Sequence, residues 1–197
     1  MSEIASIRSG SVADDAARLT PTGGSIKRLF DIVLATVGIV ILLPLFSLCI
    51  LATLLTSRGS IIFRHRRVGF QGRHFDCMTF NTTAPNGNKL LHPFAAMMRK
   101  ASLDELPELF NVLKGDMSIV GPRPMTDDEV EKYADRISAY LACKPGITGL
   151  WQGGGSKTNY RERVMLEHAY TKNWSLIMDA KILLWTLSAV IDSDDAY

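Results

Sequence analysis

The sequence predicts an α/β, helix-rich domain that associates with a membrane. An uncharged apolar run covers residues 32–57, which exceeds the roughly 20 residues that a helix needs to cross a bilayer. Two short β-prone stretches follow the run, and stretches with helical spacing of apolar residues make up most of the remainder. A chain of 197 residues has room for one domain with a real core.

The composition excludes some classes of protein. A net charge of +2 does not favour nucleic acid as a partner. Cys49, Cys77 and Cys143 stand far apart without a CxxC pair, which indicates free thiols rather than disulfides or a zinc site. Residues 1–26 are small, polar and aperiodic and lack the apolar core of a signal peptide, so we expect a disordered tail there.

Both ends of the apolar run are basic. Lys27 and Arg28 precede it, and five arginines follow it between residues 58 and 73. Basic flanks face the cytoplasm, so the helix either enters and returns on one side or crosses once as a straight span. Pro44 near the middle favours a kink, and Ser47 one turn on is a partner for a freed carbonyl. The residues alone leave both topologies open.

Beyond the run we expect two short strands, Ile61–Phe63 and His74–Met78, around a glycine turn. The arginines and histidines between them form either a solvated face or, beside a membrane, a surface for anionic headgroups or phosphate.

A helix is expected to begin at Ser102, because Ser102 and Glu105 have the spacing of a capping box and apolar residues follow at helical spacing. In that interpretation Glu105 caps the helix and Asp104 favours its N-terminus. The "GPRP" turn that follows is more rigid than an ordinary turn on the protein surface needs to be. Its prolines present the Arg123 guanidinium with little loss of freedom, which suits a phosphate.

The C-terminal third contains a second stiff turn and two expected helices. "KPGITGLWQGGGSK" is rich in glycine and offers Lys144, Thr148 and Gln152 as donors. One helix is expected over residues 160–170. Residues 173–191 are apolar except for two charges, and their tryptophans favour either the bilayer interface or a buried core.

Four segments, in this order, resemble the bacterial sugar transferase family, the monotopic phosphoglycosyl transferases that prime exopolysaccharide or glycan assembly. They are "KRLFD" before a proline-split apolar run, "SLDELPELFNVLKGDMSIVGPRP", "KPGITGLWQ" and "NWSLIMDAKILL". The resemblance extends from Lys27 to Ile191, and the segment over residues 102–124 is its most specific part.

The resemblance implies a reaction and the residues that perform it. The family transfers a sugar-1-phosphate from a UDP-sugar to polyprenyl (undecaprenyl) phosphate and releases UMP, with Mg²⁺ as cofactor. Its Asp-Glu dyad falls on Asp104 and Glu105, which makes Asp104 the expected nucleophile and both carboxylates candidate metal ligands. Family basic positions fall on Arg99 and Arg123. A polyprenyl phosphate keeps its head at the interface, which accounts for the membrane anchor.

The resemblance also implies an organisation of the chain and a location. The family's membrane segment is a re-entrant helix–break–helix, which favours a same-side return at Pro44. We therefore expect a tail over 1–26, a membrane-inserted helix over 27–57, a cytoplasmic catalytic domain over 58–191 and a C-terminal tail over 192–197. The expected location is the cytoplasmic face of the bacterial inner membrane. Membrane lipid is an expected partner, and a homo-oligomer or glycan-assembly partners are compatible with the pattern.

This chain departs from the family pattern in several places. Thr79 and Asn81 stand where basic residues are common, and Leu43 precedes Pro44 where serine is usual. After Gln152, "GGGSK" replaces the usual "SGRN", which makes Lys157 the candidate replacement for an arginine. These departures keep a second hypothesis open, a catalytically weak or silent paralogue that binds membrane lipid phosphate or an assembly partner.

Overall fold

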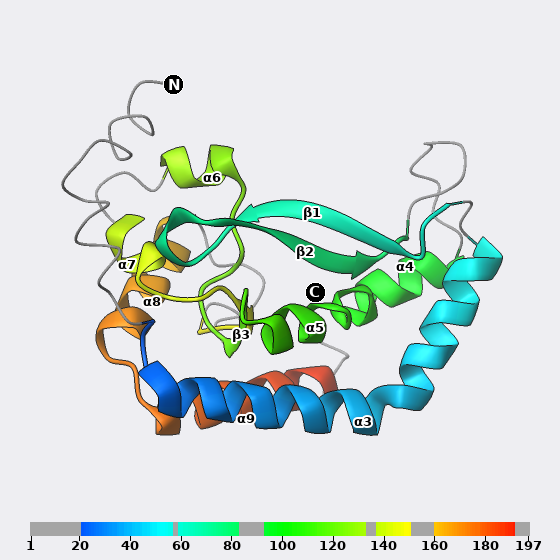
Figure 1. Ribbon diagram of the computed structural model, residues 1–197, viewed down its shortest axis with the longest axis horizontal. Coiled ribbons are helices and arrows are strands. Elements are labelled where there is room, and N and C mark those ends of the chain that lie inside the picture. Colours follow the sequence, from blue (N-terminus) through cyan, green and yellow to red (C-terminus); the bar gives the residue numbers. More distant parts are fainter. Residues whose placement is uncertain (1–20, 57–58, 83–92, 133–136, 151–159, 192–197) are drawn as a thin grey trace.

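The computed structural model describes residues 21–56, 59–82, 93–132, 137–150 and 160–191. Its longest element, helix α3 (Gly24–Thr56), lies along one side of the molecule, and a two-stranded ribbon lies along the other (Figure 1). Several shorter helices and strands lie between them. Most of the expected N-terminal tail, all of the C-terminal tail, Gln152 and Lys157 lie outside the described residues.

Helix α3 has the length and composition of a membrane helix. Its most apolar stretch has a mean hydropathy of 2.7, and only 17% of that stretch is buried inside the molecule. Ile41 and Leu55, for example, are 69% and 78% exposed. A core helix of a soluble protein buries its apolar surface, so this exposure favours contact with lipid.

Pro44 lies inside α3, which the structure records as one helix from end to end. The helix changes direction in its C-terminal half (Figure 1). Ser47 Oγ donates to the carbonyl oxygen of Leu43 at 3.0 Å. The carbonyl that Pro44 deprives of a helical partner is that of Val40, four residues earlier. The structure therefore has a bent helix in which the serine contacts a carbonyl next to the proline.

The ribbon consists of β1 (Ile62–Val68) and β2 (His74–Phe80), which pair antiparallel across a short 3₁₀ turn, Phe70–Gly72. The predicted hairpin is confirmed, but both strands are longer than expected. Arginines that were expected between the strands belong to β1, where Arg66 lies opposite Asp76. A ribbon with one wet face accommodates such charges.

The expected start of the helix at Ser102 is wrong. Ser102 has a left-handed backbone (φ 52°) and makes no side-chain capping bond. Residues Leu103–Glu105 form a single 3₁₀ turn, and α5 begins only at Glu108 and ends at Lys114. Pro107 explains the break, because it has no N–H for the Leu103 carbonyl and so interrupts the helical ladder.

Several short elements have no counterpart in the prediction. They are α4 (Pro93–Lys100), α6 (Asp127–Lys132), α7 (Ile137–Leu141) and the parallel pair β3 (Ser118–Val120) and β4 (Gly146–Thr148). Strands of three residues are too short to carry a period of two, and their pairing partner is distant in the sequence.

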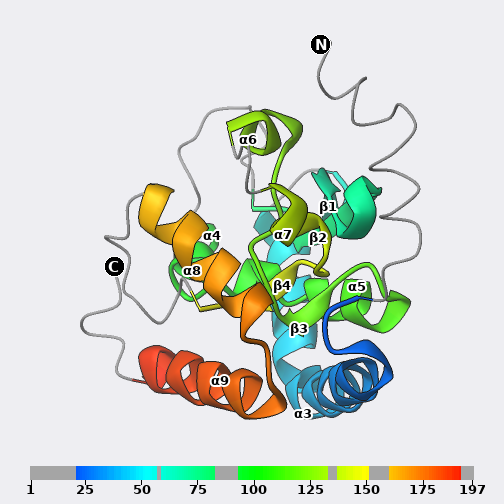
Figure 2. The same cartoon turned by 90° about the vertical axis from the view of Figure 1, so that its left-hand side faces the viewer.

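The predicted C-terminal helices are confirmed as α8 (Tyr160–Lys172) and α9 (Leu176–Ile191). Helix α9 lies beside α3 on the same side of the molecule (Figure 2). Ile182 of α9 is buried, whereas Leu184 and Trp185 are 63% and 50% exposed. One face of this helix therefore lies in the core, and its other face is exposed.

Two clusters of buried side chains hold α3 against the rest of the chain. The larger lies between α3, β2, α5, β3, α8 and α9, and the smaller joins the C-terminal half of α3 to β2 and α4 through Phe46, Cys49, Phe80 and Met98. Phe46 packs edge-on against Phe80 and Phe110, with ring centroids 6.1 and 5.8 Å apart. Both halves of α3 thus contact the same globular body.

Candidate active site

Asp104 and Glu105 lie in the 3₁₀ turn between α4 and α5, and both are half-buried. Burial raises the pKa of both carboxyls, and the negative charge of Asp104 raises the pKa of Glu105 further. The expectation that a helix N-terminus keeps Asp104 ionised is therefore not met, because Asp104 precedes α5 by a full turn. Two adjacent carboxylates with raised pKa values require cations nearby to ionise together.

Two arginines supply positive charge to the dyad from different elements. Arg99, at the end of α4, lowers the pKa of Asp104, and Arg123, in the "GPRP" turn, lowers the pKa of Glu105. The Nε of Arg99 donates to Thr82 Oγ1 at 2.8 Å. The structure thus brings together four of the residues that the sequence selected, and both arginine side chains are exposed.

Glu108 is a third carboxylate in this region, and sequence reasoning missed it. It is 7% exposed and accepts a hydrogen bond from Cys77 Sγ at 3.2 Å. Burial, followed by the charge of Glu105, raises the pKa of Glu108 to about 8. The sequence contained one signal for Glu108: it follows Glu105 by three residues, a spacing that places two side chains on the same face of a helix.

Asn111 fixes α5, and with it the dyad turn, to the ribbon. Its side-chain amide donates to the Asp76 carbonyl at 2.7 Å, and its side-chain oxygen accepts from the Met78 N–H at 3.0 Å. Both functions of the amide are used, and the residue is fully buried. A buried, satisfied side chain of this kind determines one register between helix and strand.

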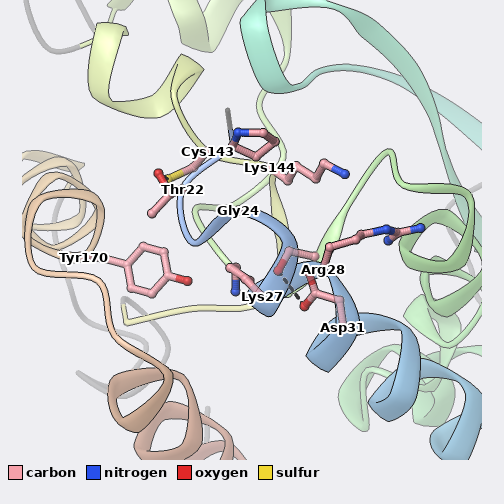
Figure 3. A pocket seen from close by; sticks show the side chains of 10 residues that line it. Thr22, Gly24, Lys27, Arg28, Asp31, Cys143, Lys144 and Tyr170 are labelled. Carbon is pink, nitrogen blue, oxygen red and sulfur yellow. Dashed lines mark hydrogen bonds between the residues drawn. The ribbon is translucent and has the colours of Figure 1, made fainter. Parts of the chain in front are cut away.

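Lys144 lies away from the dyad, in a pocket at the start of α3 (Figure 3). Burial and the neighbouring charge of Arg28 lower the pKa of Lys144. A Cβ placed on Gly115, which ends α5 with φ 97°, would lie 3.4 Å from Arg28 Nη2 and 3.5 Å from Lys144 Nζ. Both cations therefore gather at the C-terminal end of α5, where the helix dipole is negative. None of the described contacts joins Lys144 to the dyad.

The same end of α3 contains a buried ion pair that the sequence did not reveal. Lys27 Nζ lies 2.7 Å from Asp179 Oδ2, and both side chains are almost fully buried. Tyr170 and Trp174 donate to the two oxygens of Asp179, at 2.8 and 3.1 Å. Through this pair Lys27 ties α3 to α9.

Asn81 and Thr79, which stand where basic residues are common in the family, make structural contacts in this chain. Asn81 donates from its side chain to the Ser60 carbonyl at 3.1 Å, and Thr79 pairs with Phe63 across the ribbon. The other two candidate residues, Gln152 and Lys157, lie outside the described residues.

The dyad fits a Mg²⁺ ion better than it fits a metal caged by protein alone. Among the described residues, no three His, Cys, Asp or Glu side chains are placed to hold a metal together. Mg²⁺ is usually bound by one or two carboxylates, with substrate phosphates and water completing its shell. Asp104 and Glu105 offer two adjacent carboxyl groups, and a bound cation would favour the ionised form that burial disfavours.

Comparison with known proteins gives a consistent result. The model of the family "Bacterial sugar transferase" matches residues 22–193. The exopolysaccharide production protein ExoY of Sinorhizobium fredii is 36% identical, over 94% of both chains. The undecaprenyl-phosphate galactose phosphotransferase of Salmonella typhimurium is 39% identical over 87% of this chain and 42% of its own length. The UDP-glucose:undecaprenyl-phosphate glucose-1-phosphate transferase of Caulobacter vibrioides is 37% identical, over 87% and 72% respectively.

Proposed function

The chain belongs to the bacterial sugar transferase family, and we propose that it transfers a sugar-1-phosphate from a UDP-sugar to polyprenyl phosphate and releases UMP. The observation that carries the proposal is the pair Asp104 and Glu105, half-buried and flanked by the charges of Arg99 and Arg123. The names of the Salmonella and Caulobacter relatives, which act on undecaprenyl phosphate, support this substrate class. The relatives named for exopolysaccharide production support a role in that synthesis, and we propose that the reaction is its priming step.

The proposed chemistry proceeds in two displacements at one phosphorus atom. A carboxylate oxygen of Asp104 attacks the β-phosphorus of the UDP-sugar, the bond from that phosphorus to the bridging oxygen breaks, and UMP leaves. The sugar phosphate is then bound to Asp104 as an acyl phosphate. An oxygen of the polyprenyl phosphate attacks the same phosphorus, and the Asp104 carboxylate leaves unchanged.

The charges around the dyad suit this reaction. An anionic nucleophile must approach an anionic pyrophosphate, so positioned cations have to offset the repulsion. Arg99 and Arg123 supply two of them. We assign Asp104 and Glu105 as the residues that would hold Mg²⁺ together with the substrate phosphates, and the bound ion would neutralise phosphate charge. Glu105 then contributes a second carboxylate without acting as nucleophile.

The exposed apolar faces support a location at the membrane. The α3 helix and the outer face of α9 lie on the same side of the molecule, where lipid would cover them (Figure 2). We propose that α3 enters the bacterial inner membrane from the cytoplasm, turns near Pro44 and returns. The packing of Phe46 against Phe80 supports the return, because the C-terminal half of α3 remains attached to the domain that carries the dyad.

A second candidate function is a weak or silent paralogue that binds lipid phosphate or an assembly partner. The use of Asn81 as a donor to Ser60, at a position where basic residues are common in the family, favours it. Both candidates share the membrane surface, so only turnover separates them.

UMP release tests the proposal directly. The purified full chain, in detergent or lipid discs with Mg²⁺, is incubated with polyprenyl phosphate and a panel of UDP-sugars. We expect UMP from at least one UDP-sugar, together with a lipid-linked diphosphosugar. A folded protein that releases no UMP across a broad panel would identify the silent paralogue instead.

Asp104→Asn separates the nucleophile from its structural role. Asparagine keeps the shape of the side chain but lacks an anionic oxygen, so the covalent step cannot form. We expect turnover to fall by at least about a thousandfold while the midpoint of thermal unfolding changes by only a few degrees. UMP release within a few-fold of the unmodified protein would exclude the covalent scheme.

A further inference from the structure

The "GPRP" turn is held differently at its two ends. At the glycine end, the Gly121 N–H donates to the Thr148 carbonyl at 2.9 Å, and the Gly146 N–H donates to the Pro122 carbonyl at 2.8 Å. These bonds join the turn to β4 through the backbone alone. At the arginine end, the Arg123 N–H donates to a side chain, Glu167 Oε1 of α8, at 3.3 Å.

Helix α8 contacts this segment twice from one face. Tyr170 OH donates to the carbonyl of Val120 at 3.0 Å, just before the turn, while Glu167 accepts from the turn itself. Positions three apart on a helix lie on one face. Glu167 is 4% exposed and Tyr170 is 2% exposed, so both contacts are buried. Helix α8 therefore spans the segment from the end of β3 to Arg123.

Burying the Glu167 side chain carries a larger desolvation penalty than burying a neutral acceptor would. The bond from the Arg123 N–H to the Glu167 oxygen restricts where the backbone of the turn can lie. The guanidinium of the same residue acts electrostatically on Glu105 of the dyad.

We infer that Glu167 is a positioning residue, which sets the location of Arg123 relative to the dyad by holding the Arg123 N–H. The inference rests on the proposed function, in which Arg123 contacts a substrate phosphate. Phosphoryl transfer depends mainly on positioning and charge, so a small displacement of the guanidinium slows the reaction.

Three substitutions of Glu167 separate the hydrogen bond from the charge. Glu167→Met removes the acceptor at similar length, and Glu167→Asp keeps the charge but retracts it by one methylene. Both are expected to lower kcat/KM for the UDP-sugar about tenfold or more, through displacement of Arg123. Glu167→Gln keeps an acceptor oxygen and should stay within about threefold of the unmodified protein. Glu162→Gln, on the exposed surface of α8, is the matched control and should have no effect.

A double-mutant cycle with Arg123→Lys tests whether Glu167 acts through Arg123. If it does, Glu167→Met or Glu167→Asp should reduce kcat/KM by less than about twofold in the Arg123→Lys background, where the guanidinium is already absent. Equal fold-losses in both backgrounds would assign Glu167 to general stability and overturn the inference. The Asp variant keeps the cycle measurable if the Met variant does not fold.

Amide hydrogen exchange at Arg123 supplies a readout that does not need turnover. Loss of the acceptor should speed exchange of the Arg123 amide at least about tenfold, while the Gly121 amide, bonded to Thr148, stays protected. Unchanged exchange at Arg123 would overturn the inference, whatever the activity. Absence of UMP release by the unmodified protein would instead refute the proposed function, and the exchange result would still decide whether Glu167 holds the turn.

Discussion

Glu108 is a buried carboxyl group whose protonation depends on the fold. Its pKa is about 8 in the folded chain, against an ordinary value of 4.5. Between these values the folded state keeps a proton that the unfolded state has lost. The free energy of unfolding must therefore fall as pH rises from about 4.5 to about 8. Burial of this side chain costs stability at neutral pH and above.

Glu108→Gln should remove that cost. The amide oxygen can still accept from Cys77, and no charge is buried at any pH. Glu108→Gln should increase the free energy of unfolding at pH 8. We expect this increase to be roughly 2–4 kcal/mol larger at pH 8 than at pH 5. Urea unfolding at both pH values, with EDTA present, measures the difference. Glu162→Gln is the exposed control, and an equal effect of Glu108→Gln at both pH values would contradict the expected burial penalty.

Single residues of the candidate site were predictable only where they belong to a recognisable segment. The resemblance selected Asp104, Glu105, Arg99 and Arg123, and the structure brings these four together. Spacing could not reveal the Lys27–Asp179 pair, because its partners are 152 positions apart. Burial of a charged side chain depends on which distant elements cover it, and local pattern does not contain that information.

At the scale of elements, the two stiff turns "GPRP" and "KPG" pack backbone against backbone. A Cβ on Gly121 would lie 2.5 Å from the carbonyl oxygen of Lys144 and 2.8 Å from the amide nitrogen of Gly146. The sequence identified each turn as rigid but could not show that they meet. Parallel pairing of β3 with β4 brings them together, and such short strands have no periodicity to detect.

Gly121→Ala tests this close approach. Backbone atoms on the opposing turn cannot rotate away as a flexible side chain would, so the added methyl must separate β3 from β4. We expect a loss of at least about 3 kcal/mol in the free energy of unfolding, or failure to fold. Gly38→Ala is the matched control, because its Cβ would meet only Leu109 Cδ1 at 3.8 Å. Equal thermal unfolding midpoints for the two variants would show that the turns can separate without cost.

For the whole molecule, the sequence predicted the long apolar helix but left its path open. Length and hydropathy were sufficient to identify α3, since both are properties of the segment itself. Its direction beyond Pro44 depends on contacts with β2 and α4, which no local pattern contains. In the structure Lys27 is paired with Asp179 near one end of α3, and Phe46 packs on Phe80 in the other half.

These contacts lead to a prediction about topology. A straight helix of 33 residues would extend about 50 Å and separate its ends across a bilayer whose apolar core is about 30 Å thick. We instead expect a helix that contacts one globular body along both halves to keep both of its ends on the cytoplasmic side of the membrane. Single cysteines in place of Ser25 and Ser60, in a background without Cys49, Cys77 and Cys143, report the side of each end. We expect both to resist a membrane-impermeant thiol reagent in intact spheroplasts and to react after permeabilisation.

Labelling of only one of the two sites in intact spheroplasts would show a single straight span, and the packing of Phe46 on Phe80 would then be incompatible with the inserted state.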